Sequence, residues 1–430
     1  MPGAAFHGPT PMNRHRSILL VDCDTFFVQV ARLEDPQGAG RAPLLMVGGS
    51  AEGRGVVTSA DYRVREHGVR SGMPMARAVE LCPEAMVVPV PRDACLRRSR
   101  AVRAVLDRVA PVVQAASIDE FYLDLTGTER LFEGAPLEAT AHRIRERILD
   151  EAEITVSIGG GTTRLVAKLA VERAKPAGAH IVAPGQEEAF LRSHPVGAIP
   201  GIGPVFLEKL AERGIRSVEE LLAVEPEWLA RWFGAERASW LRDRARGIDP
   251  SPVDAGTERK SISSERTFAR DLEAPERLAA ELHRAVLEVG GGLRRRGLGA
   301  RTVTVKIRDH DFRTRQASRT LALPVASDRA IFRVARELLD ELRARRPVPV
   351  RLLGVGLSSL EGEGPALQLE LPVTGGDDPV GIESEADLSL AKAADALRKR
   401  FGRDALVPGR ILERPGSMGR RDTHEPEEEG

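Results

Sequence analysis

The alternation of apolar and polar residues predicts strands and helices that follow one another over residues 16–185. Short continuous apolar runs are typical of buried strands, and apolar residues three and four apart are typical of helices that cover a sheet. The predicted strands lie at 17–23, 44–47, 55–59, 112–118, 121–125 and 154–158, and the helices at 74–81, 95–109, 137–152 and 163–174. This order predicts an α/β or α+β layer with a covered sheet.

The pattern then changes, and residues 186–247 are predicted to form short helices joined by short loops. Pro and Gly residues at 248–257 indicate a linker. Residues 258–360 again mix the two element types, with a strand predicted at 302–308 and a helix at 329–343.

Other stretches are rich in Gly, Pro and charged residues, which predicts disorder. They are residues 1–15, residues 361–383 and the end of the chain from Arg414. One last amphipathic helix is indicated by Leu390, Ala394, Leu397 and Phe401. The whole chain of 430 residues is too long for one ordinary core, so three or four domains are expected.

The formal net charge is zero, but the charges are unevenly distributed. Residues 257–360 hold 22 Lys and Arg against 13 Asp and Glu, whereas residues 361–430 hold 9 against 16. A basic domain followed by an acidic tail predicts a surface for a polyanion within a neutral total.

The three cysteines, Cys23, Cys82 and Cys95, form no CxxC pair, so neither a disulfide framework nor a zinc site is expected. No apolar run approaches the roughly 20 residues of a membrane span, and residues 1–15 contain no apolar signal segment. We expect a cytoplasmic protein without a membrane partner.

Two acidic fragments at predicted strand ends are the main candidates for chemistry. Asp22 closes the first strand, and Asp119 with Glu120 lies where two later strands meet. Carboxylates beside a core are costly unless a cation neutralises them, and hard oxygen ligands favour Mg²⁺ or Mn²⁺. A solvated β-turn is the alternative for Asp119-Glu120. Asp24 is interpreted as a structural or solvated neighbour.

Residues suited to phosphate binding lie nearby in the sequence. Tyr62 and Arg65 share a predicted helical face, and Lys168 and Lys175 belong to a helix in a chain with only seven Lys against 56 Arg. Each has a plainer explanation, an exposed helix start for Tyr62 and Arg65, and a favourable helix dipole for Lys175. Phe26 is expected in the core. If the chain stays extended, Phe27 faces the opposite side and could form a wall of the site.

Two features indicate contacts with a nucleic-acid backbone. The run Ile199 to Pro204, with Gly201 and Gly203, is typical of a helix-hairpin-helix, in which backbone N–H groups at a helix start reach a phosphate. A structural helix turn is the alternative. In the basic domain, the arginines next to predicted strands are Arg294, Arg295, Arg296, Arg313, Arg315 and Arg319.

Together these residues resemble the Y-family translesion DNA polymerases, most closely the bacterial DNA polymerase IV group. The resemblance covers residues 17–360. The first acidic fragment continues as Asp22-Cys23-Asp24-Thr25-Phe26-Phe27 and is similar to one palm motif of the family; Ser117-Ile118-Asp119-Glu120 is similar to the other. Arg70 to Pro74 resembles the fingers signature, and Lys260 to Thr267 resembles the opening of the little finger.

The resemblance implies roles for individual residues. Asp22, Asp119, Glu120 and the carbonyl of Cys23 would bind two Mg²⁺ ions, for which Mn²⁺ could substitute. Phe27 would exclude a 2′-hydroxyl. The implied triphosphate-binding residues are Ser59, Tyr62, Arg65 and Lys175, and the residues we assign to DNA are Gly201, Gly203, Arg294, Arg295 and Arg315.

The resemblance has two departures. Ala31 stands where the family usually has Glu. Gln368, Leu369 and Leu371 resemble the family's sliding-clamp peptide, but Pro372 replaces an aromatic anchor. An extended peptide with leucine side chains could still dock in a clamp groove, although loss of the anchor weakens it.

The implied fold is a multidomain α+β right-hand polymerase. Its expected parts are a palm at 16–185 with fingers inserted at about 28–92, a helical thumb at 186–247, a linker at 248–257, an α/β little finger at 258–360 and an acidic tail at 361–430. The implied activity is low-fidelity synthesis by a monomer on damaged primer–template DNA from dNTPs. The alternatives are a non-catalytic DNA-binding scaffold and a palm-type nucleotidyl cyclase.

Overall fold

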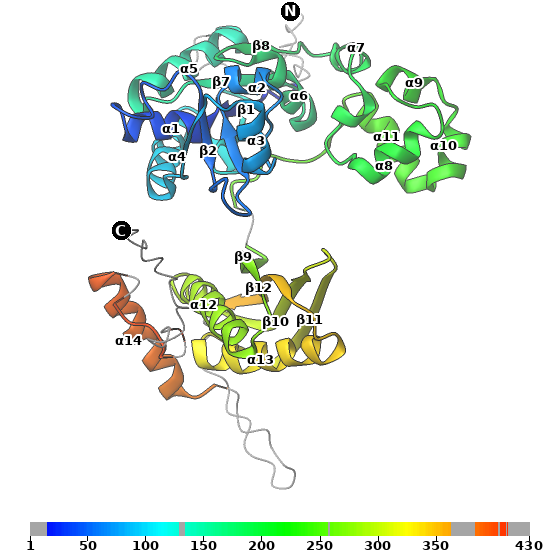
Figure 1. Cartoon of the computed structure of the whole chain (residues 1–430). Coiled ribbons are helices and arrows are strands. Elements are labelled where there is room, and N and C mark those ends of the chain that lie inside the picture. Colours follow the sequence, from blue (N-terminus) through cyan, green and yellow to red (C-terminus); the bar gives the residue numbers. More distant parts are fainter. Residues whose placement is uncertain are drawn as a thin grey trace, which may run out of the picture. The chain divides into compact units, whose positions relative to one another are not determined.

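The computed structural model describes residues 15–128, 134–256, 259–362, 383–402, 405–409 and 411. The chain divides into two compact units, Met1–Thr257 and Glu258–Gly430, which are considered separately (Figure 1). None of the helices in these ranges is long and apolar enough to cross a membrane.

The first unit is built on a five-stranded sheet with the order β5-β6-β1-β7-β8. Its central strand, β1 (Ile18–Cys23), is buried along its whole length and pairs antiparallel with both neighbours, as its continuous apolar sequence predicts. The other strands are β5 (Val112–Ala115), β6 (Glu120–Asp124), β7 (Val156–Gly161) and β8 (Ala179–Ile181).

Helices cover both faces of this sheet (Figure 1). Leu19 and Val21 of β1 pack with α1 (Phe26–Glu34), α4 (Arg92–Leu106) and α5 (Leu137–Ala152). Ile18 and Leu20, which alternate with them, pack against α6 (Arg164–Ala174). The expected covered sheet is therefore confirmed.

The three glycines at 159–161 lie inside β7, whereas the sequence predicted that the strand would end at Ile158. A Cβ on Gly159 would lie 2.2 Å from the backbone N of Val171 and 2.3 Å from the backbone O of Ala167. The strand therefore needs glycine here because α6 lies directly against its backbone.

A smaller three-stranded sheet, ordered β3-β2-β4, lies between α1 and α4 in the sequence. Its strands are β2 (Leu45–Gly48), β3 (Val57–Ala60) and β4 (Met86–Val88), and its helices are α2 (Tyr62–Glu66) and α3 (Met75–Leu81). It has its own small core around Met46, Val64 and Met75.

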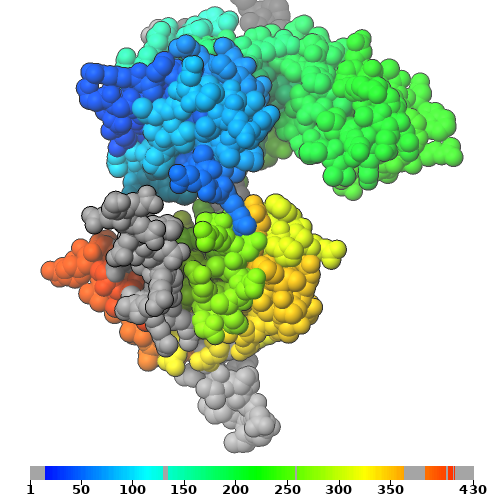
Figure 2. Space-filling view, in the orientation of Figure 1, coloured from blue at the N-terminus to red at the C-terminus, as the bar shows by residue number. Residues whose placement is uncertain are grey.

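Residues 187–245 are helical, as predicted, and Figure 2 shows them as a lobe within the first unit. The elements are α7 (Glu187–Arg192), η2 (Val196–Ala198), α8 (Pro204–Ala211), α9 (Val218–Ala223), α10 (Pro226–Phe233) and α11 (Ala235–Ala245). Their core includes Leu210, Ile215, Leu229 and Leu241.

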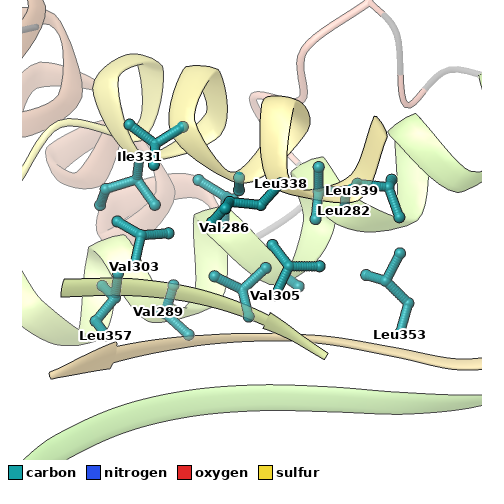
Figure 3. Close-up of a cluster of buried hydrophobic side chains, with 14 of the residues drawn as sticks. Leu282, Val286, Val289, Val303, Val305, Ile331, Leu338, Leu339, Leu353 and Leu357 are labelled. Atoms are coloured by element: carbon teal, nitrogen blue, oxygen red, sulfur yellow. The ribbon is translucent and has the colours of Figure 1, made fainter. Parts of the chain in front are cut away.

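The second unit is a four-stranded antiparallel sheet, ordered β11-β10-β12-β9, with two helices on one face. Figure 3 shows side chains of both helices pointing toward those of the strands. The elements are β9 (Ser261–Leu272), α12 (Pro275–Arg294), β10 (Leu298–Asp309), β11 (Thr314–Val325), α13 (Asp328–Arg345) and β12 (Val350–Gly362).

The predicted last helix is present as α14 (Glu385–Phe401), but most of the apolar face that indicated it is exposed. Leu390 and Phe401 are 68% and 62% exposed, whereas Ala391 and Ala394 are buried. The helix contacts the core through Leu388 and its small buried residues, and charge adds to this contact, since Asp395 pairs with Arg294 of α12 at 2.8 Å.

Candidate active site

The register of the central sheet brings the two acidic fragments together. Asp22 of β1 lies directly opposite Glu120 of β6. The N–H of Cys23 donates to the carbonyl of Asp119 at 3.0 Å. The strand pairing therefore places three carboxylate residues, distant in sequence, at one end of the sheet.

Asp22 is buried, and its main partner is an ammonium. Lys175 Nζ lies 2.9 Å from Asp22 Oδ2. Burial raises the pKa of Asp22 to about 6, although Lys175 lowers it, and Glu120 adds a smaller upward effect. One lysine therefore does not offset the cost of burying this carboxylate, and a further cation would be favourable.

The other two carboxylates are also held by neighbours. Glu120 forms an ion pair with Lys168. Asp119 accepts a hydrogen bond from the Ser117 hydroxyl, whose oxygen accepts from the N–H of Asp119 at 3.1 Å and of Glu120 at 3.0 Å. As these side chains are oriented, no three His, Cys, Asp or Glu side chains among the described residues converge as metal ligands.

The chemical type of these three side chains nevertheless suits a divalent metal. The side chains at this strand end offer oxygen atoms, which hard cations prefer. Their present partners are two ammonium groups and a hydroxyl, so a cation already stabilises two of the three. Rotation of these side chains toward a shared ion would exchange one source of positive charge for another.

Asp24 is a buried hydrogen-bonding centre, which the sequence interpretation understated. It is 3% exposed and accepts from Tyr62 Oη at 3.0 Å, Ser157 Oγ at 2.8 Å and Ala177 N at 3.0 Å. The structural half of the interpretation is confirmed, and the solvated half is wrong. The apolar strand that precedes Asp24 in the sequence could have indicated that this residue is buried.

Asp24 also positions Tyr62, one of the candidate phosphate-binding residues. Burial and the charge of Asp24 raise the pKa of Tyr62, so its phenol stays a neutral donor. Arg65 lies with its guanidinium 5.2 Å from the Tyr62 ring centre and donates to the carbonyl of Ala60 at 2.9 Å. Ser59 is buried in β3.

Phe27 lies in the first turn of α1, so the assumption of an extended chain at this point is wrong. Phe26 is buried, as predicted, and Phe27 is partly exposed beside it. The two rings meet edge to face with centres 5.5 Å apart. Successive helical residues differ in direction by about 100°, so Phe27 can stay partly exposed while Phe26 is buried.

Comparison with known proteins gives a consistent result. The impB/mucB/samB family matches residues 21–172, and the C-terminal domain of that family matches residues 259–371. A DNA polymerase IV of Caulobacter vibrioides is 37% identical over 396 residues, covering 92% of this chain and 94% of its own. The chain belongs to the Y-family translesion DNA polymerases of the DNA polymerase IV type.

Other relatives agree. A DNA polymerase IV of Gluconobacter oxydans is 38% identical over 362 residues, covering 83% of this chain and 99% of its own. A solved Y-family polymerase chimera of Dbh and Dpo4 matches with a TM-score of 0.72 and 28% identity, covering 80% of this chain and 99% of its own. DinB from Sulfolobus solfataricus matches with a TM-score of 0.55 and 28% identity.

This Y-family polymerase is thus a DNA-directed DNA polymerase with palm, small fingers, helical thumb and little finger. We propose that the five-stranded sheet is its palm and the three-stranded sheet its fingers. We propose likewise that residues 187–245 are the thumb, and that β9 to β12 with their two helices are the little finger. The family depends in general on divalent metal.

In the thumb, the hairpin of the Y-family polymerase depends on its glycines. Gly201 has φ +102°, and a Cβ there would lie 2.9 Å from the Trp240 ring. Gly203 is the N-cap of α8. Within the described thumb residues, the N–H groups of Gly203 and Val205 donate no hydrogen bond, so both can donate to a phosphate.

In the little finger of this Y-family polymerase, two of the arginines assigned to DNA are used internally. The Arg294 side chain is 3% exposed and pairs with Asp328 and Asp395, each at 2.8 Å. Arg315 donates two hydrogen bonds to the Asp309 carboxylate, from Nε at 3.0 Å and from a terminal guanidinium nitrogen at 2.8 Å. Strand alternation turns its side chain toward α13. We correct both assignments. Arg295 remains exposed.

The opposite face of the little-finger sheet is polar and flat. Its register aligns Thr302, Thr304 and Lys306 of β10 with hydroxyl and amide side chains of β11. Gly354 and Gly356 occupy the same rows in β12. The alternation of residues 302–308 in the sequence already indicated this face.

The proposed clamp residues Gln368, Leu369 and Leu371 lie outside the described residues.

Proposed function

We propose that this polymerase copies damaged template DNA with low fidelity by two-metal nucleotidyl transfer. The observation that supports this most directly is the pairing of Asp22 with Glu120, and of Cys23 with Asp119, at one end of the palm sheet. The burial of Asp22 and the ion pairs of Asp22 and Glu120 with two lysines support a site that favours positive charge.

Asp22, Asp119, Glu120 and the carbonyl of Cys23 are the residues that would hold the metal. Two bound Mg²⁺ ions would make the primer 3′-hydroxyl a better nucleophile and neutralise the triphosphate and the leaving pyrophosphate. Mn²⁺ has the same preference for oxygen ligands.

The lysines and arginine of the palm and fingers would bind the triphosphate. Lys175 has its pKa raised by Asp22 and Glu172 despite burial, so it stays charged. Arg65 is held over Tyr62, which fixes its guanidinium before a nucleotide arrives. Ser59 and the Tyr62 phenol supply neutral donors. Positioning and charge neutralisation of this kind account for most of phosphoryl-transfer catalysis.

Sugar selection and fidelity follow from the surroundings of the same site. The partly exposed side chain of Phe27 is the proposed barrier to a 2′-hydroxyl. The fingers consist of a three-stranded sheet and helices of five and seven residues. So small a domain would make few contacts with a nascent base pair. The polymerase would then select weakly for the shape of that pair and would accept damaged bases.

Primer–template DNA would be held through its backbone. The Gly203 and Val205 amides of the thumb, the polar sheet face of the little finger and the exposed Arg295 are the proposed contacts. A solved relative is titled an insertion ternary complex of Dbh DNA polymerase. A sliding clamp is the proposed partner of Gln368, Leu369 and Leu371, and the working unit is proposed to be a monomer.

The test replaces Asp119 and Glu120 together by Ala and measures primer extension and primer–template binding. We expect extension to be abolished with DNA binding retained, because the metal ligands are lost and the backbone contacts are not. The matched control replaces Glu146 and Asp150, exposed carboxylates of α5, by Ala and should extend normally. Extension by the Asp119/Glu120 variant would refute the metal assignment.

The same assay on lesion-bearing templates tests the translesion role. Wild-type protein that binds primer–template but extends neither undamaged nor damaged primers, with Mg²⁺ or Mn²⁺, would instead favour the non-catalytic scaffold.

A further inference from the structure

The thumb contains a second concave site, separate from the palm carboxylates. It has a volume of about 540 Å³ and lies between α8, the loop after it, and the junction of α10 with α11. Pockets that bind small organic groups usually have about 300–1,000 Å³. Three aromatic residues, three basic residues and Glu212 line it.

The aromatic residues form one connected cluster. The rings of Phe206 and Phe233 meet edge to face with centres 5.3 Å apart, and Trp232 lies 6.3 Å from Phe233. All three are partly exposed. The chain is only 4% aromatic, and its three Trp residues all lie in the thumb. A rare residue type is therefore concentrated in this domain.

Two arginines lie over these rings at cation–π distance. Arg213 lies 5.6 Å from the Trp232 ring centre, and Arg237 lies 4.9 Å from that of Phe206. Stacking fixes the direction of a guanidinium, so less conformational entropy is lost when it binds an anion. Lys209 adds a third positive charge to the same wall.

These three cations lack carboxylate partners in the thumb. No ion pair is found there for Lys209, Arg213 or Arg237, although many arginines elsewhere in the described chain form one. Glu212 is the pocket's single acid and is exposed. Three positive charges against one negative charge make the pocket complementary to an anion that also carries a flat apolar group.

We propose that this thumb pocket binds a nucleotide of single-stranded DNA, with its phosphate on the basic residues and its base stacked on the ring and guanidinium planes. Unpaired bases expose faces that stack on aromatic and Arg planes, whereas duplex bases are already stacked on one another. The proposal rests on the proposed function, which supplies the DNA.

The position of the pocket favours DNA over an acidic peptide. Its wall begins at Phe206, in the first turn of α8, and that helix starts at the hairpin whose amides are the proposed phosphate contacts. A strand held at the hairpin could thus reach the pocket along a single helix of eight residues. An acidic peptide ending in Phe has similar chemistry and is the main competitor to be tested.

The experiment follows tryptophan emission of the full-length protein during titration with a short oligothymidylate. Because every Trp lies in the thumb, stacking of a base on Trp232 should quench emission directly. The Trp228→Phe variant should remain quenched, since Trp228 does not line the pocket. Quenching that disappears with Trp228 would overturn the proposal.

Charge reversal tests the pocket without disturbing its core. Arg213→Glu with Arg237→Glu should weaken the binding reported by quenching at least about tenfold. The control, Arg216→Glu with Arg231→Glu, makes the same change in net charge at exposed thumb arginines outside the pocket and should have a much smaller effect. Equal weakening in both variants would mean non-specific attraction and refute the site.

Two parallel measurements separate the possible failures. Quenching by an Asp- and Glu-rich peptide ending in Phe, but not by oligothymidylate, would make the pocket a protein-binding site and refute the DNA proposal. Normal primer extension on a paired substrate without any quenching would refute the pocket and leave the proposed function intact. Absence of extension by the wild-type protein would instead contradict the proposed function.

Discussion

Asp22 has a raised pKa because its carboxylate is buried and only one ammonium contacts it closely. A buried carboxylate opposes folding when it is charged. Its charged form becomes favourable when a ligand supplies more positive charge. Lys175 and Lys168 partly fill that need in the free protein. The proposed active site thus favours an added cation at some cost to stability.

The cost should be visible in the pH dependence of Asp22→Asn. The folded-state pKa of about 6 lies above the ordinary 3.8, so Asp22 contributes most to stability below about pH 4, and that contribution is lost as pH rises through about 6. Without metal, the variant should therefore gain up to about 3 kcal/mol relative to wild type across this window. Melting temperatures in chelator at several pH values provide the measurement.

The variant also loses the Lys175 contact. Because Lys175 stays charged throughout the window, this loss changes the stability difference between the two proteins by the same amount at every pH. A difference in melting temperature that does not vary between about pH 4 and 6 would contradict the assigned shift.

Phe27→Ala should admit ribonucleotides, because it removes the proposed barrier to a 2′-hydroxyl. We expect discrimination between dNTPs and rNTPs to fall by at least about tenfold in single-nucleotide insertion, from loss of a steric clash. Phe27→Leu retains bulk at this position and serves as the control. Unchanged discrimination in Phe27→Ala would leave Phe27 only the role of packing against Phe26.

Among the elements, α14 shows how a helix can dock through charge. Its buried residues are small, and Leu388 packs partly against the core, but its other large apolar side chains, Leu390, Leu397 and Phe401, are exposed. Arg294 of α12 links Asp395 of α14 to Asp328 of α13. Glu383, just before α14, accepts from the Ala326 N–H at 2.9 Å beside the start of α13. Polar contacts therefore hold the helix at two places, through Glu383 just before its start and through Asp395 within it.

Replacing Arg294 by Met should release this helix. Two partly buried carboxylates, Asp328 and Asp395, would lose their main partner, at a cost of about 3 kcal/mol. Amide hydrogen exchange over residues 385–401 should accelerate, and the melting temperature should fall. Arg295→Met, at the exposed neighbouring position, should leave both unchanged and instead weaken DNA binding. Protection of α14 that persists in Arg294→Met would show that apolar contacts hold it.

For the whole molecule, the clamp hypothesis needs a change that spares α14. Deleting residues 361–430 would also remove Asp395 and Glu383, which contact the little finger. Replacing Gln368, Leu369 and Leu371 by Ala should lower clamp-stimulated synthesis and leave unstimulated synthesis unchanged. Thr374, Val380 and Ile382 changed to Ala form a matched control. Equal stimulation of both variants by the clamp would reject these residues as the clamp contact.

Much of the fold could be read from short-range pattern. The buried strand at 18–23, the helix at 137–152 and the helical thumb all follow from apolar periodicity, which depends on neighbours a few residues apart. The end of β7 could not be read in this way, because Gly159 is required by the approach of α6 rather than by its own sequence neighbours.

The sequence alone determined which residue types this protein offers for chemistry: carboxylates at strand ends, scarce lysines and a glycine hairpin. Only the tertiary structure decided which of them are available. It opposed Asp22 and Glu120, made Asp24 a buried acceptor, and enclosed Arg294 and Arg315 in ion pairs while leaving Arg213 and Arg237 without them. The reason is physical: residue type fixes a charge, but the partners of that charge depend on long-range packing.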